Sequence, residues 1–531
     1  MRIISGALSI VITLLSILAS GQCANILGIF TVPMASHTIV HLSVAKVLAE
    51  RGHNLTIVTL FDLPVKHEDF TVIQVPPSKE DEQQLNEVIG EATATANNGF
   101  LAAFLNAPKF LNILLRIMEN AIRDPRVKAL YENKNNKFDL MISGYLNNDF
   151  QLGIARKLKV PVIAAFPQQP LEFIASVVGN PSSLSSVPGM LTSAEKGKVM
   201  SLGQRFLEVL FSWGHSAVQK LMEHGNKKRY RSLFSDDPSM PEYEDLSKNI
   251  SLMFFNSYGL SDGPIRPNVP AVVEIGGIQI KDQPDPLPPN MAEFLGNATE
   301  GAILLSLGSN IKGSHLTPEM VQSIFRVLSN LPQLVIWKWD DLKNTPGTAN
   351  NILYSKWLPQ DDILAHPSIK LFITHAGKGG TAESQYHGKP MLAIPFFGDQ
   401  PGNAASLVKS GYGLSLSTSE LNEENFLSSI VRILEDPSFT NNVKAFSELY
   451  RDRPLTAKET VIYWTEYVLR HRGAPHMQSP LVHMSFIAAH NLDIYFLIAF
   501  IVYLLVIMIK FICRLCKRKP YKVGKQKVKK N

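Results

Sequence analysis

Short apolar runs alternate with segments of helical periodicity from Asn25 onwards. The run ILGIFTV predicts a strand, and after a turn come apolar positions at helical spacing, at Val40, Val44, Val47 and Leu48. Gly52 predicts the end of that helix, and LTIVTLF predicts the next strand. A strand, a helix and a strand in this order favour parallel pairing in one sheet.

The same alternation continues and then starts again in the second half of the chain. Further strands are expected at 140–143 and 162–166 with a helix at 149–158 between them, and residues 173–248 are expected to form a partly helical insertion. The proline-rich stretch 282–289 predicts a linker, because successive prolines fit neither a helix nor a central strand.

A second α/β series follows the linker. Its strands are expected at 302–309, 334–339, 369–375 and 390–395, with helices opening near 317 and 379. The fold class is therefore α/β, with two tandem, doubly wound, Rossmann-like domains. In such folds the ligand crevice lies at the carboxyl ends of the strands.

Both ends of the chain carry targeting patterns. Residues 3–18 are apolar and are followed by small residues, which predicts a signal peptide cleaved near Gly21 or Cys23, with an uncleaved anchor as the alternative. Residues 492–513 are long and apolar enough for one transmembrane helix, with a buried core helix as the alternative. The basic tail 514–531 places the C-terminus in the cytosol and the bulk of the chain in the lumen.

Charge and cysteine content exclude several function classes. The nine lysines and arginines of the tail exceed the whole-chain charge of +6, so the remainder carries −3, and basicity does not argue for nucleic-acid binding. The three cysteines, at 23, 513 and 516, leave the lumenal part without a disulfide framework or a cysteine metal site. The last five residues, 527–531, resemble a dilysine retrieval signal and point to the endoplasmic reticulum.

The most informative stretch is 357–400, WLPQDDILAHPSIKLFITHAGKGGTAESQYHGKPMLAIPFFGDQ. A strand runs into a glycine-rich turn that opens a helix, and backbone N–H groups in such a turn are suited to a diphosphate. The spacing of FITHAG, Glu383, Pro390, Pro395 and Asp399-Gln400 strongly resembles that of the UDP-glycosyltransferase family, the UDP-glucuronosyltransferases and their UDP-glucosyltransferase relatives.

This resemblance implies a GT-B fold with the UDP-sugar in the second domain. It implies that Trp357 stacks on the uracil, that Gln360 bonds its edge, and that Glu383 binds the ribose hydroxyls. It also implies that Asp399 and Gln400 hold the sugar. A carboxylate suits paired hydroxyls because each of its oxygens can accept a hydrogen bond.

The diphosphate contacts are assigned in the same way. The resemblance implies that His375 and Gly377 hold the diphosphate and that Ser309 makes another phosphate contact. Gly379 and Gly380 belong to the same turn and are candidate backbone contacts. The other interpretations are a core Trp, a surface Gln and a capping Asp.

In the first domain, the family's general base corresponds to His37, while the neighbouring His41 is interpreted as structural. The family orients its base with an acidic residue at a position that here is Gly144, which is a departure from the pattern. Asp149, five residues later, is the candidate replacement, with water as the alternative. An unoriented imidazole loses control of its tautomer.

The sequence therefore predicts inverting transfer of a glucuronosyl or glucosyl group from a UDP-sugar to hydroxyls of small lipophilic acceptors. No metal and no bound cofactor are expected, and the UDP-sugar is a co-substrate. The alternative is a catalytically weakened family member that binds UDP-sugar or a lipophile as a carrier or partner subunit. Homo- and hetero-oligomers stay open.

The expected domain plan covers the chain from end to end. It comprises a signal peptide 1–23, an acceptor-binding domain 24–281, a linker 282–300, a UDP-sugar-binding domain 301–473, a juxtamembrane segment 474–491, the transmembrane helix 492–513 and a cytosolic tail 514–531.

Overall fold

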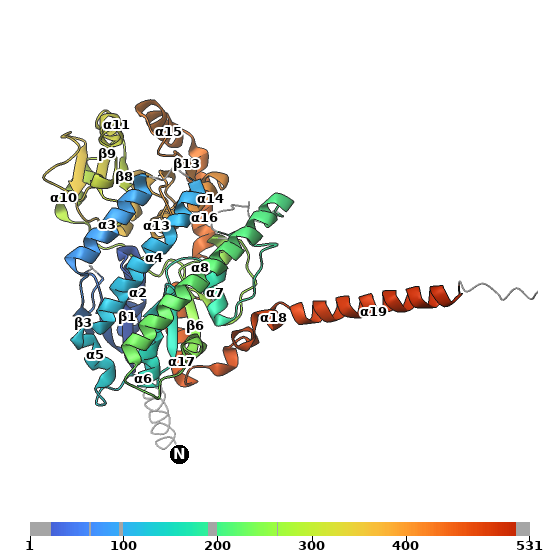
Figure 1. The fold of residues 1–531 in the computed structure, drawn as a ribbon. Helices are drawn as coiled ribbons and strands as arrows, with labels where there is room; N and C mark the ends of the chain where they lie inside the picture. Colours follow the sequence, from blue (N-terminus) through green and yellow to red (C-terminus); the bar gives the residue numbers. More distant parts are fainter. Residues whose placement is uncertain (1–22, 63–64, 95–98, 190–198, 263, 517–531) are drawn as a thin grey trace, which may run out of the picture. The chain divides into compact units, whose positions relative to one another are not determined.

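A computed structural model describes residues 23–62, 65–94, 99–189, 199–262 and 264–516 (Figure 1). Nearly all of the expected signal peptide and most of the basic tail lie outside the described residues. The chain up to Ser479 forms one compact unit that contains two sheets, and the chain from Pro480 forms a second unit.

The first sheet has seven parallel strands in the order β3-β2-β1-β4-β5-β6-β7. Strands β1, β4, β5 and β6 are almost wholly buried, as expected for a parallel sheet that is covered on both faces. The strands are β1 (Asn25–Phe30), β2 (Asn54–Thr59), β3 (Phe70–Gln74), β4 (Leu140–Gly144), β5 (Val162–Phe166), β6 (Ile250–Phe255) and β7 (Val272–Glu274).

Helices pack on this sheet and extend beyond it. Their bounds are α2 (Ala35–Glu50), α3 (Lys79–Ala94), α4 (Gly99–Arg123), α5 (Pro125–Glu132), α6 (Gly153–Leu158), α7 (Glu172–Ala175), α8 (Leu202–Phe234) and α9 (Gly259–Asp262). The helix expected at 149–158 starts as a 3-10 turn, Asp149–Leu152, and continues as α6. The expected insertion contains the long α8, which begins with a capping box made by Ser201 and Gln204.

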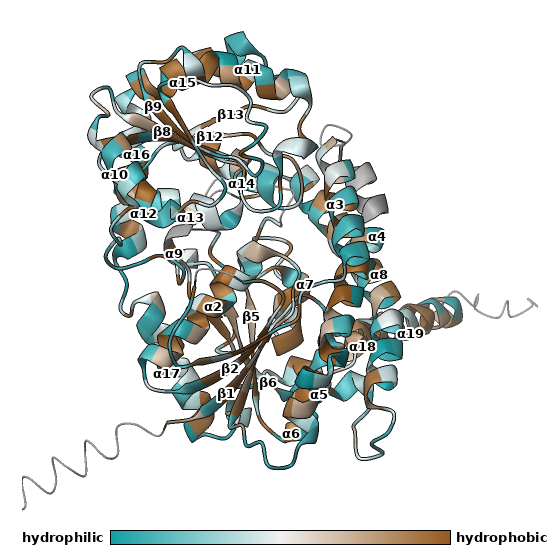
Figure 2. Ribbon diagram, turned by 90° about the vertical axis from the view of Figure 1, so that its left-hand side faces the viewer, coloured by the Kyte–Doolittle hydropathy of each residue, from teal (hydrophilic) through white to brown (hydrophobic). Residues whose placement is uncertain are grey.

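The second sheet has six parallel strands in the order β10-β9-β8-β11-β12-β13. Its strands are β8 (Ala302–Ser306), β9 (Leu334–Lys338), β10 (Ile352–Ser355), β11 (Ile369–Thr374), β12 (Met391–Ala393) and β13 (Gly413–Ser415). Its helices are α10 (Pro289–Gly296), α11 (Pro318–Ser329), α12 (Gln360–Ala365), α13 (Lys378–Tyr386), α14 (Gln400–Lys409), α15 (Glu423–Glu435) and α16 (Pro437–Arg451). Figure 2 shows the apolar strands of each sheet between layers of helices.

In both sheets the strand order changes direction next to the first strand. In the first sheet, β2 and β3 lie on one side of β1, and β4 to β7 lie on the other side. In the second sheet, β9 and β10 lie on one side of β8, and β11 to β13 lie on the other. Loops that leave adjacent strands in opposite directions open a crevice at their carboxyl ends. The two candidate binding places are therefore the β1/β4 edge and the β8/β11 edge.

Helix α17 (Ala457–Arg470) follows the second sheet in sequence but packs on the first. Its Val461 and Val468 are fully buried in the core of the first sheet. Arg51, at the end of α2, donates to Glu466 over 2.8 Å, and Figure 2 shows α17 near α2. The last helix of this unit thus ties the second half of the chain back to the first.

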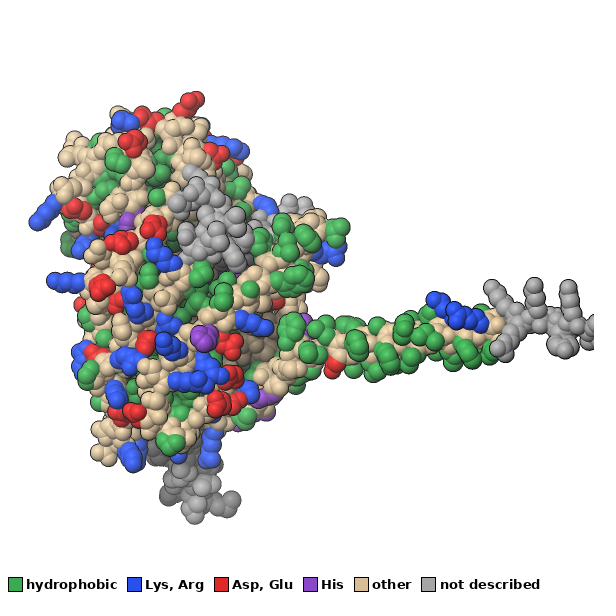
Figure 3. Space-filling model, viewed as in Figure 1, with side chains coloured by type: hydrophobic (Ala, Val, Ile, Leu, Met, Phe, Trp, Pro, Cys, Tyr) green, Lys and Arg blue, Asp and Glu red, His purple; other side chains and the backbone are tan. Residues whose placement is uncertain are grey.

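The second unit contains α18 (Phe486–Ala489) and α19 (Leu492–Cys516). Helix α19 has 25 residues, and none of its side chains is buried. At 1.5 Å per residue it is about 37 Å long, which is enough to cross a hydrocarbon core of about 30 Å. Figure 3 shows apolar side chains along this helix and basic ones at its far end. Within the described residues it is the one helix long and apolar enough to span a membrane.

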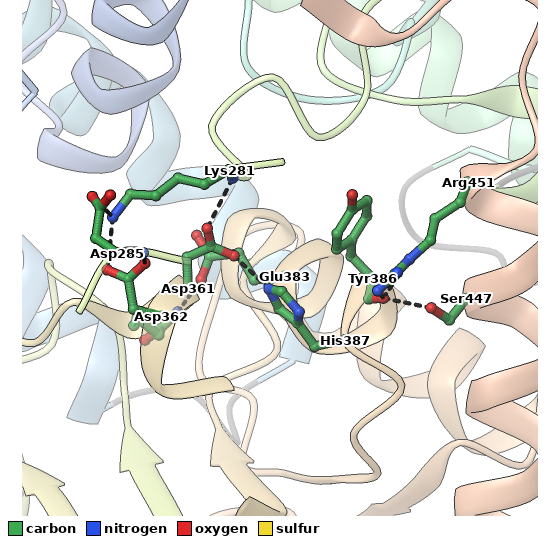
Figure 4. Close-up of polar contacts among 10 residues, drawn as sticks. Lys281, Asp285, Asp361, Asp362, Glu383, Tyr386, His387, Ser447 and Arg451 are labelled. Carbon is green, nitrogen blue, oxygen red and sulfur yellow. Dashed lines mark hydrogen bonds and ion pairs between the residues drawn. The ribbon is translucent and has the colours of Figure 1, made fainter. Parts of the chain in front are cut away.

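The segment between the two sheets is fastened to the start of α12 (Figure 4). The Lys281 Nζ atom lies 2.6 Å from Asp362 Oδ2, and the Asp285 N–H donates to Asp362 Oδ1 over 2.8 Å. The Lys281 N–H donates to Asp361 Oδ2 over 2.9 Å. The Asp362 side chain is 3 % exposed, so its charge depends on these protein partners.

We predict that Lys281→Ala lowers the free energy of unfolding by about 2–4 kcal/mol, because it leaves the buried Asp362 carboxylate without its countercharge. The control is Lys66→Ala, which removes an ion pair to Asp62 whose side chains are 69 % and 67 % exposed and should cost less than about 0.5 kcal/mol. Urea unfolding of the detergent-solubilised full chain measures both. Equal losses in the two variants would contradict the role of the Lys281 pair.

Candidate active site

One cavity of about 950 Å³ is lined by residues from both sheets. From the first half of the chain, its lining includes the start of α2 and the loop after β5. From the second half, it includes the loops after β8 and β11 and the starts of α12 and α13. Both switch edges therefore open into the same space.

The turn after β11 holds an imidazole between two glycines. Ala376 has a φ of +60°, a left-handed conformation that bends the chain directly before Gly377 and helix α13. A Cβ on Gly377 would lie 2.3 Å from His375 Nε2, and a Cβ on Gly308, whose φ is +81°, would lie 2.5 Å from His375 Cε1. Both positions need glycine because the His375 ring fills the side-chain space.

Burial, and then the nearby charge of Lys338, lower the pKa of His375 to about 4, so its imidazole is neutral at physiological pH. The Lys338 Nζ donates to the Gly308 carbonyl over 2.7 Å and lies 6.0 Å from the centre of the Trp357 ring. Sequence reasoning missed this lysine, although a lysine at the carboxyl end of a central strand was a usable signal.

Three predicted nucleoside contacts also line the cavity. Trp357 is 41 % exposed and lines the cavity, which leaves its ring available to a ligand. Gln360 Nε2 donates to Glu383 Oε2 over 2.6 Å, so these two residues already pair with each other. Burial, and then the charge of Asp361, raise the pKa of Glu383 to about 8.

The predicted sugar contacts also line the cavity. Asp399 Oδ2 accepts from Asn403 Nδ2 over 2.7 Å, and burial raises the pKa of Asp399. The side-chain oxygen of Gln400, Oε1, accepts from the backbone N–H groups of Phe396 and Phe397. The side-chain NH₂ group of Gln400 does not take part in these two bonds. Asn403 was not predicted, although it lies one helical turn after Asp399.

The remaining predicted phosphate contacts are in the same lining. Ser309 is placed in the loop after β8, and Gly377, Gly379 and Gly380 lie at the start of α13. A Cβ on Gly380 would contact Gln360 Nε2 at 3.1 Å, whereas a Cβ on Gly379 would meet nothing within 4 Å. Close packing thus explains the glycine at 380 and does not explain the one at 379.

His37 lies in the first turn of α2 and lines the cavity from the first half of the chain. The residue is 8 % exposed, and its buried Nδ1 finds no hydrogen-bond partner among the residues that the structure describes. Burial, and then the charge of His41, lower the pKa of His37 to about 3, so the imidazole is in its proton-accepting form.

The structure does not bring Asp149 to His37, which corrects the expected pairing. Asp149 accepts from the Tyr145 hydroxyl over 2.8 Å and from the Tyr243 hydroxyl over 3.1 Å. Asn147 has a φ of +52°, and the 3-10 turn that follows starts at Asp149, which is not part of the cavity lining. Both carboxylate oxygens therefore have tyrosine partners, and burial raises the pKa of Asp149.

Two doubly wound parallel sheets whose switch edges open into one cavity make up the GT-B architecture. This architecture is shared with a Polygonum tinctorium UDP-glucosyltransferase solved with 3,4-dichloroaniline, at a TM-score of 0.56, 16% identity, 85% of this chain and 99% of that chain. CalG4, the calicheamicin glycosyltransferase, has a TM-score of 0.51 at 17% identity, over 85% of this chain and 100% of that chain.

Residues 28–528 match the family model described as UDP-glucoronosyl and UDP-glucosyl transferase. The UDP-glycosyltransferase UGT5 of Dactylopius coccus is 33% identical over 94% of this chain and 93% of its own. The UDP-glucuronosyltransferase 2B14 of Oryctolagus cuniculus is 28% identical over 87% and 88%. The chain belongs to this family, and it is a glycosyltransferase whose sugar donor is a UDP-sugar.

We predict that Glu383→Gln stabilises the ligand-free protein in a pH-dependent way. Between the ordinary glutamate pKa near 4.5 and the folded value of about 8, the folded protein holds the extra proton, so stability falls as pH rises. The gain from glutamine should be nearly absent near pH 4.5 and on the order of 4 kcal/mol at pH 8, at about 1.4 kcal/mol for each pKa unit.

Urea unfolding of the full chain at pH 5 and pH 8 measures this difference. The exposed Glu300→Gln is the control and should show the same change at both pH values. A gain from Glu383→Gln that does not grow with pH would contradict the raised pKa.

Proposed function

We propose that this enzyme transfers a hexosyl group from a UDP-sugar to a hydroxyl of a small lipophilic acceptor, with inversion at the anomeric carbon. The observation that carries the proposal is that His37 from the first sheet and the His375 turn from the second line one cavity. A proton acceptor and a diphosphate site facing the same space are the two components that an inverting transfer requires.

The donor half supplies a partner for each part of a UDP-sugar. In the proposed complex, the exposed Trp357 ring stacks on the uracil, and Gln360 and Glu383 turn from each other to the base edge and the ribose hydroxyls. Such exchange is feasible because both residues line the cavity. The opposite end of the donor meets Asp399 and the free NH₂ group of Gln400.

The diphosphate lies at the start of α13 in this proposal. The N–H groups after Gly377 and the helix dipole favour an anion there. His375 and Ser309 add hydrogen-bond donors, and Lys338 adds a positive charge beside the Gly308 carbonyl. These groups stabilise the negative charge that grows on the leaving UDP.

In the chemical step the acceptor oxygen attacks the anomeric carbon from the face opposite UDP. The new carbon–oxygen bond forms as the bond from the anomeric carbon to the β-phosphate oxygen breaks, and UDP leaves with that electron pair. His37 Nε2 takes the hydroxyl proton. Attack opposite the leaving group inverts the carbon, and the neutral state of His37 suits the proton transfer.

The acceptor class follows from the wall around His37. The described side chains there are mostly apolar, and they come from the start of α2, the loop after β2, α4, the loop after β4, and the end of β5 with the segment that follows it. They are Met34, Ile39, Val40, Val65, Phe110, Leu111, Leu114, Leu146, Phe166, Leu171 and Phe173. A wall of this kind binds an apolar ring or chain through burial and leaves its hydroxyl to the histidine.

We predict that His37→Ala and Trp357→Ala separate catalysis from donor binding. His37→Ala should lower kcat by about 10²- to 10⁴-fold and leave the Kd for UDP within twofold, because it removes the proton acceptor alone. Trp357→Ala should raise the Kd for UDP by about 5- to 100-fold, because it removes the stacking surface. Calorimetry with UDP and product detection by mass spectrometry measure the two quantities.

A panel of phenols and steroids, offered with UDP-glucose and with UDP-glucuronate in parallel, identifies the sugar by product mass. Full turnover in His37→Ala would overturn the base assignment. UDP binding by the unaltered chain without product from either donor would favour the carrier or partner-subunit alternative.

We further propose that the enzyme is a single-pass protein of the endoplasmic reticulum with its bulk in the lumen. Helix α19 has the length and composition of a span, and Arg514 at its end begins the basic tail. Basic residues flanking a span favour the cytosolic side.

We predict that protease added to intact microsomes removes a C-terminal epitope tag and spares the rest of the chain, because the membrane shields the lumenal part. Immunoblots for the tag and for an epitope after Cys23 give the result, and detergent-opened microsomes are the control in which both signals vanish. Loss of the N-terminal epitope from sealed microsomes would contradict the orientation.

A further inference from the structure

The space next to Gly144 is filled by an imidazole. A Cβ on Gly144 would lie 2.7 Å from His41 Cε1 and 2.8 Å from His41 Nδ1. Strand β4 ends at this residue, at the switch edge beside β1. A side chain at position 144 would collide with the His41 ring in this position. The glycine in place of the family's acidic residue therefore makes room for His41.

The tautomer of His41 is fixed by its surroundings. Its Nε2 lies 3.1 Å from the Ala165 carbonyl oxygen, which can only accept, so Nε2 carries the hydrogen and Nδ1 carries a lone pair. The ring is fully buried and packs on Phe30 with 5.2 Å between ring centres. Its Nδ1 is buried and has no partner among the described residues.

His37 and His41 therefore present complementary unpaired atoms one helical turn apart on α2. If His37 Nε2 is to accept a proton, its Nδ1 must carry a hydrogen, and this buried Nδ1 also has no described partner. Buried polar atoms are nearly always hydrogen-bonded. His37 Nδ1 carries a hydrogen and needs an acceptor, whereas His41 Nδ1 carries a lone pair and has no donor.

Three polar side chains that follow β4 already have hydrogen-bond partners of their own. Asp149 accepts from two tyrosines. Gln151 accepts from Thr31 and donates to Ser143 Oγ and the Gly144 carbonyl. Asn148 donates to the same carbonyl and accepts from a backbone N–H group.

We propose that His41 is the positioning residue for His37: a single water accepts the His37 Nδ1 hydrogen and donates to the His41 Nδ1 lone pair, so that it joins two buried atoms that have no described partner. This holds the proton-free Nε2 of His37 towards the acceptor hydroxyl. The inference rests on the proposed function, in which His37 is the base. A neutral imidazole thus takes the place that a carboxylate at position 144 has in the family pattern.

Two amide substitutions separate this role from a purely structural one. His41→Asn places an amide atom near the position of Nδ1 and loses the contact with Ala165, whereas His41→Gln reaches the Ala165 carbonyl and leaves the Nδ1 position empty. We expect His41→Gln to be the more stable variant and His41→Asn the faster one, with kcat at least about tenfold higher. The KM for the donor should stay within twofold in both.

A reciprocal exchange tests the same idea without depending on either amide. His41→Ala empties the space beside Gly144, and His41→Ala with Gly144→Asp puts a carboxylate into it. We expect the single variant to lose kcat at least about tenfold and the aspartate to restore most of it. His41→Ala with Gly144→Leu is the matched control, because leucine fills the space without an acceptor and should restore none.

Equal kcat in the aspartate and leucine double variants, or a His41→Gln variant as fast as the unaltered enzyme, would overturn the proposal. His37→Ala distinguishes this failure from that of the proposed function. An inactive His37→Ala beside a fully active His41→Gln rejects the positioning role alone, whereas an active His37→Ala rejects the base itself.

Discussion

The paired carboxylates at the start of α12 are the constraint on which the rest of the site depends. Asp361 and Asp362 are both buried, and two adjacent buried charges would repel each other and remain poorly solvated without separate partners. Lys281, from the segment that connects the sheets, binds Asp362. Asp361 Oδ1 lies 2.6 Å from Nε2 of His387, the residue directly after α13 (Figure 4). The same helical turn thus fixes the connecting segment and presents Gln360 to the cavity.

Several polar groups of the donor half pair with one another before a ligand arrives. Gln360 pairs with Glu383, and Asn403 pairs with both Asp399 and the Ala376 carbonyl. A ligand that binds to these paired groups exchanges hydrogen-bond partners, so their contribution to its affinity is the difference between two bonded states. Stacking on the exposed Trp357 and the charge interactions of the diphosphate are net gains, because neither has a counterpart in the empty site.

The sequence predicted the two-sheet α/β class and most of the central strands, because buried parallel strands are short apolar runs bounded by turns. The short strands β10 and β13 were not predicted, since four and three residues give too weak a pattern, and strands β3, β6 and β7 of the first sheet were missed as well. The motif around His375 could be assigned because its residues lie close together in the sequence and match the family pattern as one string. Its neighbour Lys338 was missed: its position at the carboxyl end of a predicted strand was a usable signal, but its contact with the Gly308 carbonyl depends on how strand β9 pairs.

The part of the site that comes from the first half of the chain was less predictable, because its contacts join residues from different helices and strands. Sequence spacing suggested Asp149, but the left-handed turn at Asn147 and the partners Tyr145 and Tyr243 decide where that carboxylate lies. Tyr243 is 94 residues away along the chain, so no local pattern could reveal the contact. The proximity of His41 to the end of β4 is likewise a matter of helix packing, which single-sequence patterns do not encode.

The acceptor side of the cavity is apolar and holds a neutral imidazole, whereas the proposed donor side holds a charged diphosphate. This difference determines the order of events in the proposed reaction. Beside an apolar acceptor wall, an unpaired carboxylate would cost several kcal/mol to desolvate, whereas a neutral imidazole avoids most of that cost. The neutral imidazole is a weak base, because burial and the neighbouring His41 hold the pKa of His37 near 3 in the empty site. The negative diphosphate of a bound donor raises the pKa of a nearby imidazole, because opposite charge favours the protonated form. In the proposed reaction His37 therefore becomes an effective base after the donor is in place, which couples proton removal from the acceptor to the presence of the sugar it will attack.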